Sequence, residues 1–108
     1  MSVLASKDPE VRAAVDAINR SSLEGFMQLF GADPVVNDSD IEYRGLAEVE
    51  KWASHDIFNV HGRLTVEGGS GEASNVVHGN YESQGGYNGP SVWTFRIVGG
   101  KVSYLEIQ

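Results

Sequence analysis

His78 is one of two candidates for proton transfer in this chain, and it stands inside a predicted β-strand over residues 75–82. If Val76, His78 and Asn80 face the interior, an imidazole and an amide enter it together, as an acid–base group beside a hydrogen-bond donor. The opposite parity turns the imidazole outward. Alternation is compatible with both orientations, and counting back from Trp93 without gaps favours His78 inward.

Metal chemistry finds no support in the spacing of the possible ligands. The chain has three histidines and no cysteine, and no two histidines stand two or four residues apart as a strand or helix ligand pair requires. We therefore predict neither a metal nor another cofactor. The lack of cysteine excludes disulfides and thiolate nucleophiles. With no signal-peptide pattern and no stretch of transmembrane length, we expect a cytoplasmic protein.

The composition is that of one acidic domain, residues 1–108. Hydrophobic residues make up 41% of the chain, which is enough for a packed core. The formal net charge is −7, and this argues against nucleic acids and anionic membranes as partners, because both attract basic surfaces.

Asp38 is the leading candidate for acid–base chemistry. It belongs to Asn37-Asp-Ser-Asp40, which is typical of a tight turn because such side chains bond to nearby amides. A carboxylate at the mouth of an apolar cavity would instead be a suitable general base, since desolvation raises its proton affinity. Turn aspartates are the more frequent of the two.

Three helices are expected. Asp8-Pro-Glu10 begins the first, a capping box of Ser21 and Glu24 begins the second, and Gly45 opens the third. Gly31 ends the second helix. Each helix carries an apolar stripe at helical spacing, formed in turn by Val11, Ala14, Val15 and Ile18, by Leu23, Phe26, Met27 and Phe30, and by Leu46, Val49, Trp52 and Ala53.

The rest of the chain alternates with period two, which predicts an α+β fold with a curved antiparallel sheet. Short strands are expected at 34–37 and 41–44, and longer ones at 63–67, 75–82, 92–98 and 101–107. The last two form a hairpin that turns at Gly99-Gly100. A three-residue turn would put Leu105 and Ile107 on the face of Trp93, whereas a two-residue turn would expose both aliphatic side chains at about 1.5–3 kcal/mol each. We predict the three-residue turn.

Taken in order, these elements resemble SnoaL-like, or ketosteroid isomerase-like, members of the nuclear transport factor 2-like superfamily. The resemblance rests on Phe30-Gly-Ala-Asp-Pro-Val-Val-Asn-Asp38 after the second helix, on Tyr43-Arg-Gly45 before the third, and on Trp93-Thr-Phe-Arg-Ile97 before a Gly-Lys turn. It implies a cone-shaped domain, in which three helices pack on the concave face of the curved antiparallel sheet and leave a pocket between them.

The resemblance also implies site residues. It puts Asp38 where ketosteroid isomerase-like proteins hold a proton-shuttling aspartate, and His78 is the second catalytic candidate. Ala14 and Trp93 stand where the isomerases have their oxyanion-binding tyrosine and acid, so classical steroid isomerisation is not expected. The implied pocket would be lined by side chains of helices and strands, namely Phe26, Phe30, Trp52, Val76, Asn80, Trp93 and Phe95.

Two functions remain open. The first is the binding of a small hydrophobic molecule in the pocket, with acid–base chemistry of an isomerase, cyclase or hydrolase type. The second is a non-catalytic dimeric binding or interaction module whose pocket is filled by side chains, since aromatic residues at these spacings are more often core than pocket wall.

The resemblance further implies a homodimer formed through the outer face of the sheet. The contributing residues would come from the last hairpin, namely Thr94, Arg96, Val102, Tyr104 and Glu106. A two-fold contact would let Arg96 of one subunit pair with Glu106 of the other. An ordinary solvated face is the alternative.

Overall fold

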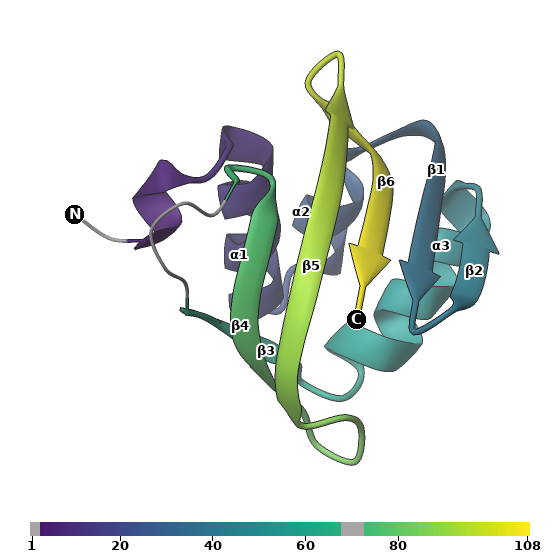
Figure 1. Cartoon of the computed structure of the whole chain (residues 1–108). Coiled ribbons are helices and arrows are strands. Elements are labelled where there is room, and N and C mark those ends of the chain that lie inside the picture. The colour runs from purple at the N-terminus through teal and green to yellow at the C-terminus, as the bar shows by residue number, and fades with distance from the viewer. Residues whose placement is uncertain (1–2, 68–72) are drawn as a thin grey trace.

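The computed structural model describes residues 3–67 and 73–108, which form one six-stranded sheet with helices on a single face (Figure 1). The strand order is β2-β1-β6-β5-β4-β3. The strands are β1 (Phe30–Asp38), β2 (Ile41–Arg44), β3 (Arg63–Glu67), β4 (Val76–Glu82), β5 (Gly89–Val98) and β6 (Lys101–Ile107). The helices are the 3₁₀ turn η1 (Val3–Ser6), α1 (Pro9–Asn19), α2 (Leu23–Met27), α3 (Leu46–Ala53) and the π-helical turn η2 (Ser54–Phe58).

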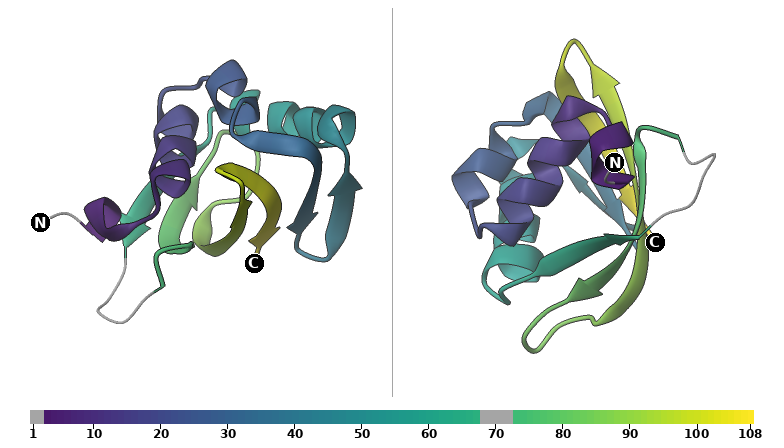
Figure 2. Two further views of the ribbon diagram at one scale, coloured as in Figure 1. Left: turned by 90° about the horizontal axis from the view of Figure 1, so that it is seen from above. Right: turned by 90° about the vertical axis from the view of Figure 1, so that its left-hand side faces the viewer.

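The predicted α+β cone is confirmed. Figure 2 shows the helices gathered on one side of the sheet, which curls around them. Trp93 points inward and is only 2% exposed, as the alternation of β5 predicted. No helix within the described ranges is long and apolar enough to cross a membrane.

The second helix is shorter than predicted. Ser22, not Ser21, caps it, because the Ser22 Oγ accepts a hydrogen bond of 3.1 Å from the Gly25 amide. The helix ends at Met27, and Phe30 begins β1, where it pairs with Val102 of β6. The predicted helical position of Phe30 is therefore wrong. A helix of five residues has little stability of its own, and pairing with β6 determines the conformation.

Gly45 caps α3 as predicted, with a φ of 88° that favours glycine. Glu48 reaches back to accept a hydrogen bond of 3.0 Å from the Arg44 amide. Trp52 is buried, but Leu46 is 43% exposed, so its predicted inward position is wrong. Leu46 is the first residue of the helix and precedes the turn that packs on the sheet.

The β5–β6 hairpin buries the predicted face through a different turn. Gly99 and Gly100, with φ values of 58° and 77°, form a two-residue turn between the paired Val98 and Lys101. Ser103 is an unpaired bulge residue, which restores Leu105 opposite Phe95 and Ile107 opposite Trp93. The predicted three-residue turn is therefore wrong, although its burial argument is correct.

The bulge also corrects one predicted interface residue. Val102 pairs with Ile97 on the inner face and is fully buried in the core. It cannot contribute to a contact through the outer face of the sheet. The other four residues, which precede or follow the bulge, keep the outward parity, namely Thr94, Arg96, Tyr104 and Glu106.

One pairing of the sheet is parallel, which the antiparallel prediction missed. β1 and β6 run in the same direction, because no short turn joins them and their relative direction is free. The ends of β1, β4 and β6 therefore meet the start of β5 at one end of the sheet, the lower end in Figure 1. The end of α3 and η2 lie across this same end (Figure 1).

Candidate functional site

A cavity of about 510 Å³ lies at this end of the cone. The walls come from the β1–β2 turn, the end of α3 with η2 and the residues after it, the end of β4 with its loop to β5, and the neighbouring ends of β5 and β6. The lining residues are Asp38, Ser39, Trp52, His55, Asp56, Ile57, Val60, Tyr81, Gly85, Gly86, Tyr87, Ser91, Trp93, Ile107 and Gln108.

Asp38 is the last residue of β1 and lies half-buried in the cavity wall. Its Oδ2 accepts a hydrogen bond of 3.0 Å from the indole Nε1 of Trp52, and its Oδ1 lies 3.5 Å from the Ser39 hydroxyl. The turn role belongs instead to Asn37, whose Oδ1 accepts a hydrogen bond of 3.0 Å from the Asp40 amide. The carboxylate of Asp38 is thus directed toward α3 and not toward the turn amides.

The backbone beside Asp38 is strained. Ser39 and Asp40 form a two-residue turn with φ values of 51° and 72°, in the left-handed region that favours glycine. The turn is held in place by the Ser39 amide, which donates a hydrogen bond of 3.0 Å to the carbonyl of Ile107. This contact joins the end of β1 to the end of β6 and fixes one edge of the cavity.

Both tryptophans of the chain line the cavity, and both indole N–H groups have acceptors. Trp52, 3% exposed, donates to Asp38, and Trp93, 2% exposed, donates to the Ser91 hydroxyl at 2.9 Å. Ser91 is itself buried. The two indoles are therefore held in fixed orientations by partners that also belong to the cavity wall.

Tyr81 forms the β4 side of the cavity. Its hydroxyl donates a hydrogen bond of 2.9 Å to the backbone carbonyl of Asp56, and its ring centroid lies 6.2 Å from that of Trp93. Burial raises the pKa of Tyr81 to about 12, and the negative charges of Asp56 and Asp38 add to the increase. Tyr81 therefore remains a neutral donor at physiological pH.

Asp56 lies in the π-helical turn η2, where the Asn59 amide bonds to the carbonyl of Ser54, five residues earlier. This wider turn follows α3 directly and carries His55, Asp56 and Ile57 into the cavity wall. The His55 Nδ1 lies 2.5 Å from the Asp56 Oδ1, with the imidazole largely exposed. No group of three His, Asp or Glu side chains in the described ranges could hold a metal ion.

The predicted inward orientation of His78 is wrong. In β4 the buried residues are Val77, Gly79 and Tyr81, so His78 is exposed on the outer face of the sheet. Gly79 explains this orientation of β4. The strand packs so closely at this position that a Cβ atom would lie 2.7 Å from the Thr65 carbonyl, so only glycine fits there. Val76 and Asn80 share the outward parity of His78 and do not line the cavity, contrary to the prediction.

Three aromatic residues predicted in the pocket belong to the packed core. Phe26, Phe30 and Phe95 are at most 6% exposed, and none lines the cavity. Phe26 packs against Phe30 at a centroid distance of 5.2 Å and against Phe58 at 5.7 Å. Phe26 also lies 6.3 Å from Trp52, so this core adjoins the cavity wall.

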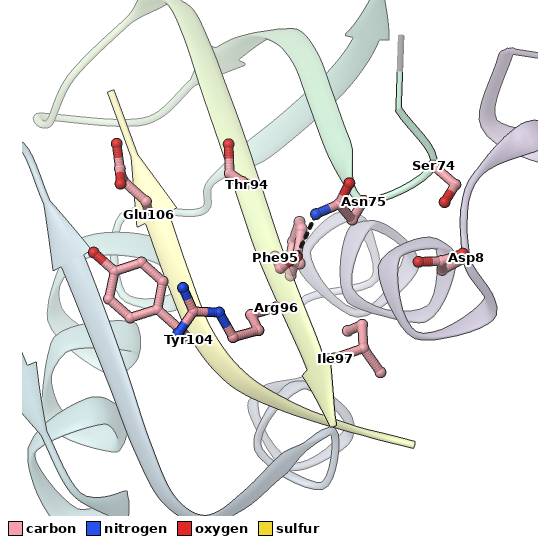
Figure 3. A pocket seen from close by; sticks show the side chains of 9 residues that line it. All are labelled: Asp8, Ser74, Asn75, Thr94, Phe95, Arg96, Ile97, Tyr104 and Glu106. Atoms are coloured by element: carbon pink, nitrogen blue, oxygen red, sulfur yellow. Dashed lines mark hydrogen bonds between the residues drawn. The ribbon is translucent and has the colours of Figure 1, made fainter. Parts of the chain in front are cut away.

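A second hollow of about 450 Å³ lies on the outer face of the sheet (Figure 3). Figure 3 shows Arg96 extending toward Tyr104, and the guanidinium carbon lies 5.4 Å from the ring centroid. Asn75 closes one side with a hydrogen bond of 2.8 Å from its Nδ2 to the Phe95 carbonyl. Thr94 and Glu106 lie on the same face.

No family model and no curated protein matches this chain. Solved structures do match it. A candidate polyketide cyclase from Sinorhizobium meliloti superimposes with a TM-score of 0.85 at 17% identity, over 99% of this chain and 100% of that chain. A protein from Catenulispora acidiphila with a ketosteroid isomerase-like fold, in complex with trimethylamine, gives a TM-score of 0.73 at 16% identity, over 94% and 85%. A Mycobacterium tuberculosis protein in complex with estradiol-17beta-hemisuccinate gives 0.72 at 15% identity, over 91% and 88%.

The chain has the ketosteroid isomerase-like fold. This is also the fold of nuclear transport factor 2-like proteins, as the order of elements predicted. At these sequence identities the likeness establishes the fold.

Within this ketosteroid isomerase-like fold, the cavity brings together three of the predicted site residues, Asp38, Trp52 and Trp93. Tyr81 and Asp56, which the sequence prediction omitted, complete the wall. The opposite parity of β4 would have indicated that Tyr81 faces the interior. Asp56 could not have been predicted, because no sequence signal indicates that the helix after Ala53 continues as a π-helical turn.

Proposed function

We propose that this protein binds a small organic molecule in the cavity at the open end of the cone, and that Asp38 transfers a proton to or from it. The supporting observation is a half-buried carboxylate in the wall of an aromatic cavity of about 510 Å³. Solved structures with the same fold hold trimethylamine or a steroid hemisuccinate. Because those ligands differ so widely, we infer the ligand class of this protein from the residues of its own cavity wall.

The role of Asp38 follows from what its two oxygens contact. Oδ2 accepts the Trp52 N–H, which fixes the carboxylate in the cavity wall. Oδ1 has only the neighbouring Ser39 hydroxyl, at a distance of 3.5 Å that is long for a hydrogen bond. One oxygen therefore positions the group and the other can accept a proton from a bound molecule.

Binding can be tested with Nile red, a neutral dye whose emission rises and shifts to the blue in an apolar site. The wild type is expected to bind it saturably. Val60→Trp would fill the cavity from its wall, whereas Val98→Trp changes an exposed residue of the far hairpin turn and serves as the matched control. Loss of the signal in the first variant alone supports the proposal, and equal binding by both variants contradicts it.

Proton transfer can be tested with 5-nitrobenzisoxazole. A carboxylate removes its C3 proton while the N–O bond opens to a coloured nitrophenolate. Asp38→Asn keeps an oxygen acceptor for Trp52 but removes the base, and Asp56→Asn is the control for the second carboxylate of the wall. We expect a faster reaction with the wild type and with Asp56→Asn than with Asp38→Asn.

A second candidate function is binding without catalysis. Equal rates for the wild type and Asp38→Asn, combined with saturable dye binding, would favour this alternative. A pocket filled by Phe26, Phe30, Trp52 and Trp93 would also favour this alternative. The two phenylalanines are packed in the core, but the two tryptophans border an open cavity.

We also propose that the outer face of β5 and β6 forms a homodimer. Thr94 pairs with Glu106 and Arg96 with Tyr104 across the two strands, so their side chains form one continuous surface. A two-fold contact there would let Arg96 pair with the partner's Glu106. Sedimentation should show a dimer that Arg96→Glu dissociates, and a monomeric wild type would contradict the proposal. The cytoplasmic location remains a prediction.

A further inference from the structure

We propose that the molecule bound in the cavity is an organic cation, such as a protonated or quaternary amine. This inference rests on the proposed binding function and specifies its ligand class. Two features of the wall support it together, namely the sign of its charged side chains and the number of aromatic rings among the residues that line it. A cation of this class combines an apolar surface with a diffuse positive charge, which matches both features.

The charged side chains of the wall are acidic. Asp38 and Asp56 line the cavity, and its described lining includes no lysine or arginine. His55 is the one basic side chain of the described lining, and its ring is hydrogen-bonded to the Asp56 Oδ1. Even with this imidazole protonated, the wall keeps a net negative charge, so an anionic ligand would be repelled.

Four aromatic side chains line the cavity together with these carboxylates. Trp52, Tyr81, Tyr87 and Trp93 come from α3, β4, the loop after β4 and β5, respectively. Aromatic rings carry negative potential on their faces and attract ammonium groups, with tryptophan as the strongest of them. The geometry is that of an apolar enclosure with two carboxylates in its wall.

The hydrogen-bond donors of these rings are already used inside the protein. The Trp52 indole bonds to Asp38 and the Trp93 indole to Ser91. The Tyr81 hydroxyl bonds to the Asp56 carbonyl, and the Tyr87 hydroxyl bonds to the Pro90 carbonyl at 2.7 Å. These four side chains therefore have no unpaired donor for a carbonyl or carboxylate group of a ligand.

The negative field of the two carboxylates reaches the aromatic wall. Besides burial, the charges of Asp56 and Asp38 raise the pKa values of both Tyr81 and Tyr43. The same field that disfavours a tyrosinate would favour a cation in the space between these groups.

The test compares choline with 3,3-dimethyl-1-butanol, in which a carbon atom replaces the charged nitrogen. Both tryptophans line the cavity, so intrinsic fluorescence can follow both titrations, with sodium chloride as the ionic-strength control. We expect choline to bind at least about tenfold more tightly than the neutral alcohol. Asp56→Asn should weaken choline binding and leave the alcohol unaffected, whereas Glu106→Gln on the outer face should change neither.

Nile red distinguishes failure of this inference from failure of the proposed function. Equal or tighter binding of the alcohol would overturn the cation inference while the cavity remained a binding site. Absence of binding by choline, with Nile red still bound, would also overturn it. If Nile red does not bind either, both the inference and the proposed function are wrong.

Discussion

Two adjoining groups of aromatic residues in the cone pack in different ways. Phe26 of α2 packs directly on Phe30 and Phe58, with centroid distances of 5.2 and 5.7 Å. Trp52, whose ring lies 6.3 Å from that of Phe26, and Trp93 are just as buried, yet they border a cavity of about 510 Å³. Burial alone therefore does not distinguish core from pocket wall.

The polar groups account for the difference. The phenylalanines have no polar atom, so nothing opposes their close packing. Each indole instead bonds to a polar side chain of the wall, Asp38 or Ser91, and this bond holds the ring in place. A rigid wall of this kind can persist around a space that a ligand fills.

Phe26→Ala should have the largest effect on stability, because it removes a fully buried ring that packs on Phe30 and Phe58. We expect the free energy of unfolding to fall by about 3–5 kcal/mol. Urea denaturation followed by circular dichroism would measure it. A cost near zero would mean that the phenylalanine core is as loosely packed as the cavity.

Gly79→Ala should rank second. A methyl group there would approach the Thr65 carbonyl to 2.7 Å and Leu64 Cδ1 to 2.9 Å, so the backbone must shift. We expect a loss of about 1–3 kcal/mol, as for other overpacked sites. The control is Gly31→Ala, where the nearest atom would be at 3.7 Å, an ordinary contact. Equal costs for both variants would contradict the inward position of Gly79.

Trp52→Phe should have a smaller effect, because it keeps a ring at the open end and removes the donor to Asp38. Since Asp38 is half-exposed and water can replace the indole, we expect a loss of about 0.5–1.5 kcal/mol. A double-mutant cycle with Asp38→Asn would isolate the interaction. Additive effects of the two substitutions would show that the hydrogen bond does not link these side chains.

Ionisation of Tyr81 should have no effect on stability at neutral pH and should lower it only in alkaline solution. The pKa of Tyr81 is raised from 10.0 to about 12, so the folded state retains its proton where the unfolded chain loses it. Stability from this group is complete below pH 10 and should decline between pH 10 and 12. Tyr81→Phe should remove this part of the decline, and an unchanged profile in the variant would assign it to other groups.

The sequence predicted the order of the elements and the inner face of the last hairpin. That face was predictable because exposing Leu105 and Ile107 costs more than any choice of turn. The turn itself was predicted incorrectly, because the Ser103 bulge achieves the same burial with two glycines. Local patterns determine which side chains are buried, and several backbone paths can bury them.

The parity of β4 shows a similar limit. Val76 and Val77 are equally apolar, so alternation could not decide which one faces the core. The decisive contact is the close approach of Gly79 to Thr65 and Leu64, which depends on the pairing with β3. The orientation of His78 was therefore a tertiary property that the strand sequence did not contain.

Of the candidate site, the sequence supplied Asp38, Trp52 and Trp93, and it added three phenylalanines that belong to the core. All these aromatic residues have suitable spacing for either role. Which of these aromatic residues line the cavity depends on the positions of α2 and η2 over the sheet. The sequence pattern does not indicate those positions.

The most direct test is to map the binding site by NMR during titration with choline and with 3,3-dimethyl-1-butanol. The two indole N–H signals of the chain both report on the cavity. We expect saturable shifts at Trp52, Trp93 and the amides of residues 85–87, larger with choline. Saturable shifts confined to the outer face around Arg96 and Tyr104, or none with either compound, would contradict binding in the cavity.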